Sequence, residues 1–81
     1  PASFVTMVNE MLAQILFALG ESPDPATGRR YRDLEVAKHY IDTLAVLERK
    51  TRGNLTDEEK RMLDTALYQV RMRYVQAAQM G

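Results

Sequence analysis

The chain of 81 residues has no cysteine, one histidine and no net charge. Without cysteine it has no disulfide framework, no thiolate metal ligand and no thiol nucleophile, which fits a protein of the reducing cytoplasm. Eleven acidic and eleven basic residues cancel, so no overall field attracts the chain to nucleic acid or to an anionic membrane. At this length it forms at most one domain, residues 1–81, whose core is marginal unless something reinforces it.

Long apolar runs and alternating patterns are also missing. The most apolar segment, residues 3–19, is interrupted by polar side chains such as Asn9 and Glu10 and is too short for the roughly 20 apolar residues of a membrane span. It has no basic start or cleavage pattern of a signal peptide. Since no segment alternates apolar and polar residues with a period of two, we expect neither a membrane span nor a β-strand.

Three segments have the features of helices. Residues 3–19 contain no proline or glycine and begin with Ser3, a good N-cap, while residues 33–52 carry apolar side chains at helical spacing after Asp33. The third segment, residues 56–78, opens with the T-x-x-E pattern of a capping box.

The two connectors differ in length and stiffness. Asn54-Leu55 is short, which makes the second and third helices an antiparallel hairpin. The connector 20–32 contains Pro23 and Pro25, which fix their own φ angles, and Gly28, which permits a positive φ. We therefore expect this connector to be ordered and wrapped over the bundle. Leu19 and Tyr31 are expected to anchor its ends. The sequence thus predicts an all-α, three-helix unit.

The first and third helices carry more apolar side chains than one core needs. The first is apolar over more than half its circumference, and the third has a second apolar strip opposite its core stripe. Burial of these faces against another copy favours a helical-bundle homodimer. The predicted oligomer interface comprises Phe4, Met7, Met11, Leu12, Ile15, Tyr68, Met72 and Val75. The alternative is that these side chains fill the core of a single chain.

Residues that could carry chemistry have simpler explanations. His39 lies one helical turn from Glu35 and Asp42, but no nucleophile or second histidine accompanies it, so we interpret the group as solvated charges. The acidic run at residues 57–59 suits the positive end of a helix dipole without any metal. We therefore expect no catalytic residue, no metal and no cofactor, and no enzyme activity.

Basic side chains form one candidate binding patch. The connector supplies three arginines without obvious partners, and the end of the third helix returns beside them. The possible patch for an anion or an acidic partner is Arg29, Arg30, Arg32, Lys38, Arg71 and Arg73. The alternative is that these side chains cap carbonyl groups at the end of the first helix.

Three motifs resemble a known family. ALGESPDPATG, KTRGNLTDEE and LYQVRMRY are similar to a small bacterial family, domain of unknown function eighteen forty-four, over nearly the whole chain. The resemblance implies a helical cytoplasmic protein and no established activity. We predict a self-associating interaction or scaffold module that binds itself, as a dimer, and perhaps another protein. The alternative is nucleic-acid or anion binding through the arginine patch.

Overall fold

A computed structural model describes residues 2–21 and 23–79 of the chain. It contains three helices, α1 (Phe4–Ala18), α2 (Leu34–Lys50) and α3 (Asp57–Gln79), and no strand in the described ranges. The all-α prediction is confirmed, and every helix end lies within two residues of its predicted place.

Each helix begins at the cap that the sequence predicts. The Ser3 side chain accepts a hydrogen bond from the backbone N–H of Thr6, and the Asp33 carboxylate accepts from those of Glu35 and Val36. At α3 the Thr56 N–H donates to the Glu59 carboxylate at 2.9 Å, while the Glu59 N–H donates to the Thr56 hydroxyl at 3.1 Å. This reciprocal pair is a capping box.

Helix α1 ends in a Schellman motif. The N–H of Gly20 donates to the carbonyl of Phe17, and the N–H of Glu21 donates to that of Leu16, both at 3.0 Å. Gly20 has a φ of +80°, and a Cβ at this position would lie 3.2 Å from the carbonyl oxygen of Tyr31. Glycine is therefore required both by the backbone angle and by the close approach of the connector.

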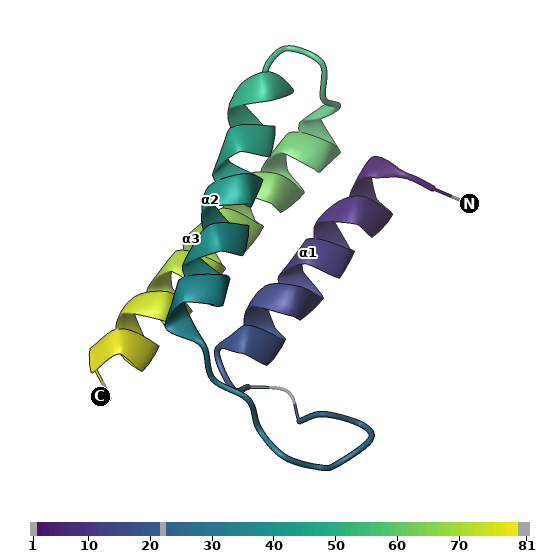
Figure 1. The fold of residues 1–81 in the computed structure, drawn as a ribbon. Coiled ribbons are helices and arrows are strands. Elements are labelled where there is room, and N and C mark those ends of the chain that lie inside the picture. Colours follow the sequence, from purple (N-terminus) through teal and green to yellow (C-terminus); the bar gives the residue numbers. More distant parts are fainter. Residues whose placement is uncertain (1, 22, 80–81) are drawn as a thin grey trace.

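Successive helices run in opposite directions, and α2 and α3 form the predicted antiparallel hairpin (Figure 1). The start of α1 lies at the end of the bundle that holds the turn between α2 and α3, whereas the end of α3 lies at the opposite end, with the long connector (Figure 1). All three helices contribute to one core, and no polar or charged side chain of the described residues is buried. The core residues are Val8, Ile15, Ala18, Leu19, Ala37, Ile41, Leu44, Leu63, Ala66, Leu67 and Val70.

The connector is held mainly by its own hydrogen bonds. The Asp24 N–H donates to the carbonyl of Arg29 and the Gly28 N–H to that of Asp24, at 2.8 and 2.7 Å. The loop extends beyond the end of the helices instead of wrapping over them, which corrects our expectation (Figure 1). Most of its described side chains are exposed, and few of them are large and apolar, so covering the bundle would bury little apolar area.

The two ends of the connector are anchored as predicted. Leu19 is buried in the core, and the Tyr31 ring stacks on Phe17 with 5.4 Å between ring centroids, although Tyr31 remains 44% exposed. The N–H of Asp33 also donates to the carbonyl of Ala18 at 2.8 Å. This bond fixes the start of α2 against the end of α1.

The three helices form a flat layer. The Cα atoms span 39 × 30 × 17 Å with a radius of gyration of 13.3 Å, against about 12 Å for a compact domain of this length. The accessible surface is 5825 Å². A folded monomer of this mass exposes about 5000 Å² on average, so the chain leaves about 850 Å² more surface open to solvent.

Candidate functional site

The eight residues predicted for an oligomer interface differ in exposure. Met7, Tyr68, Met72 and Val75 are exposed, whereas Phe4, Met11 and Leu12 are half-buried against the core. Ile15 is completely buried within the single chain, because it lies on the face of α1 that α2 and α3 cover. Its side chain cannot reach a second copy, so we remove Ile15 from the proposed interface.

Three exposed residues of α3 form one apolar strip, which we call the α3 strip: Tyr68, Met72 and Val75. They are 66%, 46% and 51% exposed and follow one another at intervals of four and three residues. This spacing places them on one side of the helix. They are among the most exposed large apolar side chains of the described residues.

A shallow hollow of about 300 Å³ adjoins the α3 strip. Besides the strip, Leu67 lines this hollow, and so do charged side chains of both signs: Glu48 of α2 with Asp64 and Arg71 of α3. The hollow therefore presents an apolar surface between opposite charges, a composition suited to a protein contact.

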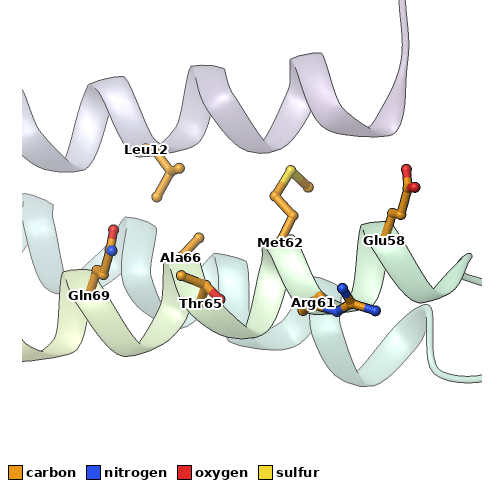
Figure 2. A pocket seen from close by; sticks show the side chains of 7 residues that line it. All are labelled: Leu12, Glu58, Arg61, Met62, Thr65, Ala66 and Gln69. Atoms are coloured by element: carbon orange, nitrogen blue, oxygen red, sulfur yellow. The ribbon is translucent and has the colours of Figure 1, made fainter.

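A second groove, of about 410 Å³, lies between α1 and α3 (Figure 2). Leu12 points from α1 toward Met62 and Ala66 of α3, and Glu58 and Gln69 lie along the α3 side (Figure 2). Sequence reasoning assigned Leu12 to an interface but missed Met62. Its signal was present in the sequence, since Met62 precedes Leu63 and lies four residues before Ala66, which places it at the edge of the core.

The six residues of the predicted basic patch do not form one group of unpaired cations. Arg30 donates to the carbonyl of Gly20 at 3.0 Å, Arg32 donates to the carbonyl of Ala77, and Arg73 pairs with Glu21. Lys38 pairs with Asp42 at 2.8 Å, while Arg71 lies in the hollow beside the α3 strip. Arg30 thus caps a carbonyl at the end of α1, as the alternative predicts.

Arg29 and Arg30 still share one surface feature. They line a hollow of about 320 Å³ on the connector together with Phe17, Tyr31, Asp24 and Thr27. The stacked rings of Phe17 and Tyr31 and the two arginines thus line the same hollow. Aromatic rings beside cations can hold an anionic ligand that has a flat apolar part.

Two further ion pairs of the described residues, Arg52–Glu48 and Lys60–Asp64, each join residues four apart in the sequence. Arg52 binds the Glu48 carboxylate through two nitrogens, at 2.6 and 2.9 Å, and this hydrogen bonding lowers the pKa of Glu48. The pKa of Asp33 is also lowered, first by the hydrogen bond from the Val36 N–H and then by that from the Tyr31 hydroxyl. These shifts arise from local hydrogen bonds at a helix surface and a helix cap.

The described structure shows no hydrogen bond or ion pair between His39 and the carboxylates of Glu35 and Asp42. Asp42 is engaged by Lys38, and the His39 ring lies edge-on to the Tyr40 ring with 5.5 Å between centroids. Among residues 2–21 and 23–79 no group of three or more His, Asp or Glu side chains could hold a metal ion. No helix in these ranges is long and apolar enough to cross a membrane.

Comparisons with known proteins identify the family of the chain but no relative of known function. No curated protein and no solved structure matches the chain. The family described as Domain of unknown function (DUF1844) matches residues 1–76, nearly the whole chain. This match confirms the resemblance that the connector, the hairpin and the end of α3 indicate: the chain belongs to the DUF1844 family.

Proposed function

We propose that this protein is a cytoplasmic, self-associating helical module that binds a second copy of itself and serves as an interaction or scaffold component. The observation that carries the proposal is the α3 strip. Three large apolar side chains, each about half exposed or more, stand on the outside of a flat helical layer. Exposed apolar patches of this kind mark protein interaction sites.

The surface area of the chain supports the same proposal. Its excess of about 850 Å² over an average monomer is close to the roughly 800 Å² that each partner buries in a standard protein interface. The core holds eleven buried residues among those that the structure describes, and association would add apolar burial at about 25 cal/mol per Å². A second copy thus supplies the reinforcement that a chain of this length needs.

An enzymatic role has less support. The only histidine of the sequence has no carboxylate partner in the described residues, and Asp42, one helical turn away from it, pairs with Lys38. Nucleophiles and bases of enzymes lie within hydrogen-bonding reach of one another in a cleft. We therefore propose a binding role rather than catalysis.

Light scattering coupled to gel filtration tests the proposal directly. We expect a mass of twice the 9.3 kDa of the chain at micromolar to millimolar concentration, with a shift toward the monomer on dilution. A mass of one chain at every concentration up to about 1 mM would refute self-association.

A second candidate function uses the hollow on the connector. Its support is the pairing of Arg29 and Arg30 with the Phe17–Tyr31 stack, a combination suited to single-stranded nucleic acid or a flat anion. Fluorescence anisotropy of a labelled oligonucleotide tests whether this hollow binds single-stranded nucleic acid. Binding that weakens steeply with salt and falls further in Arg29→Gln would support this function. No binding at low salt would exclude it.

A further inference from the structure

The groove between α1 and α3 is lined by uncharged side chains over most of its length. Leu12 of α1 lies opposite Met62 and Ala66 of α3 in this groove of about 410 Å³ (Figure 2). Its charged lining residues among those that the structure describes are Glu58 and Arg61, and both belong to the start of α3. From Met62 toward the end of α3 the described lining is therefore free of charge.

Helical spacing extends this uncharged surface along both helices. Val5 precedes Leu12 by seven residues, two helical turns, so it lies on the same side of α1, and its side chain is 42% exposed. Met72 follows Thr65, an exposed residue of the groove, by the same interval and is 46% exposed. We call this surface the groove face: Val5, Leu12, Met62, Thr65, Gln69 and Met72.

Helix α1 contributes almost no charge to the surface. Glu10 is its only ionisable residue, and it lies two residues before Leu12, about 200° around the helix and thus on the side away from the groove. Charged side chains supply most of the exposed surface of α2 instead: Glu35, Lys38, Asp42, Arg49 and Lys50. Burying the groove face therefore removes few charges from water, whereas burying the outside of α2 would remove several.

We propose that two copies of this chain pack through the groove face, groove against groove, about a two-fold axis. This inference rests on the proposed self-association and names its surface. The area fits, because the chain exposes about 850 Å² more than an average monomer of its mass and each partner in a standard interface buries about 800 Å². Since Met72 also belongs to the α3 strip, this pairing covers one end of the groove face and part of the strip together.

The lack of charge selects a second copy as the occupant. Nucleic acids and anionic membrane surfaces are bound through clusters of Lys and Arg, and Arg61 is the only cation among the described residues that line the groove. A charged protein surface would lose the hydration of its charges without gaining partners. A second groove face is uncharged and of the same size, and such a match of a surface with itself is what a two-fold interface requires.

A charge introduced into the groove face tests the proposal. Gln69→Lys places an ammonium group in each groove, at a position that is exposed in the single chain and so tolerates the change. Because pairing would bury these like charges without partners, we expect the dissociation constant, measured by light scattering over a dilution series, to rise at least about tenfold. Gln14→Lys is the matched control, since Gln14 is also exposed but lies two residues, about 200°, from Leu12 on α1. Its dissociation constant should stay within about threefold of that of the unmodified chain.

The outcomes separate the groove face from self-association itself. Thr65→Lys repeats the test at a second exposed position of the groove, and circular dichroism checks that each variant keeps its helices. A dimer that both groove variants leave unchanged, or that the control weakens equally, would overturn the groove face while self-association stands. A monomer mass for the unmodified chain up to about 1 mM would refute self-association and, with it, the second copy as the occupant.

A tryptophan probe measures burial of the groove face directly, because the chain has no tryptophan of its own. The emission of Gln69→Trp should move to shorter wavelength as the concentration rises through the dissociation constant, since the indole leaves water for an apolar interface. Gln14→Trp should keep the emission of an exposed indole over the same range. A shift in Gln14→Trp alone, together with the rise in mass, would place the interface on the opposite side of α1 and contradict the proposal.

Discussion

Shortening Leu63 to alanine removes a side chain from the centre of the core, where it is completely buried. Leu63 lies on α3 in the same cluster as Ile15 of α1 and Leu44 of α2, which are also fully buried. No polar group of the described residues is buried nearby, so the loss is one of apolar contact alone. The substitution therefore measures the packing that joins all three helices.

The expected loss of stability follows from the complete burial of Leu63 and from the thinness of the helical layer. Replacing a fully buried leucine by alanine lowers the free energy of unfolding by about 2.7–5 kcal/mol. The loss is smaller where neighbouring side chains move in to fill the cavity. Because the layer is only 17 Å thick, neighbouring side chains lie close to the surface and can relax, so we expect about 3 kcal/mol. The free energy of unfolding of a domain of this length is about 4–12 kcal/mol in total. The midpoint of thermal unfolding should fall by roughly 12–24 °C.

Urea unfolding followed by circular dichroism gives the free energy, with all proteins at one concentration because association also stabilises the chain. Val46→Ala is the matched control, since Val46 lies on α2 outside the core and is 42% exposed. It should change the free energy by less than about 0.5 kcal/mol. A loss below about 1 kcal/mol for Leu63→Ala, with an unchanged urea dependence, would refute the assignment of Leu63 to the centre of the core.

Four further predictions concern the caps and the connector. Thr56→Ala should lower the free energy of unfolding by about 1 kcal/mol because the capping box is lost, whereas Thr56→Ser should retain it; equal urea midpoints would contradict the box. Replacing Pro23 and Pro25 by alanine should lower stability by about 1 kcal/mol through greater freedom of the unfolded chain, measured in the same way. Arg30→Gln removes one exposed hydrogen bond to the end of α1 and should cost less than about 1 kcal/mol; a larger loss than in the proline variant would show that the arginine, not the prolines, fixes the loop. The pKa of Asp33 is lower in the folded chain than in the unfolded one, so its contribution is present above the ordinary aspartate pKa and is lost as pH falls through the folded value. Asp33→Asn keeps a cap that does not titrate and should therefore lose less stability between about pH 7 and about pH 3; an equal loss would contradict this role.

The local features of the fold were predictable from the sequence because short-range chemistry determines them. A helix start needs an acceptor for its free N–H groups, and Ser3, Asp33 and Thr56 each supply one within three residues. The end of α1 needs a residue that tolerates positive φ, which Gly20 provides. The helices, their order and the α2–α3 hairpin follow from such signals.

Which apolar residues face the core was decided by tertiary packing. Ile15 and Met7 both belong to the broad apolar arc of α1, yet Ile15 is completely buried and Met7 is exposed. The helical period places a residue on an arc but does not say which part of the arc the neighbouring helices cover. The sequence therefore indicated a surplus of apolar surface, and the packing of α2 and α3 located it.

Contacts of charged side chains with distant parts of the chain were likewise beyond sequence reasoning, whereas three ion pairs join residues only four apart. Arg73 pairs with Glu21 and Arg32 donates to Ala77, across 52 and 45 residues of chain. By itself the sequence determined three helices, their caps, their order and membership of the family. Only the tertiary structure decided that Arg73 pairs with Glu21 and that Tyr68, Met72 and Val75 remain exposed. Both results depend on contacts between segments far apart in the chain.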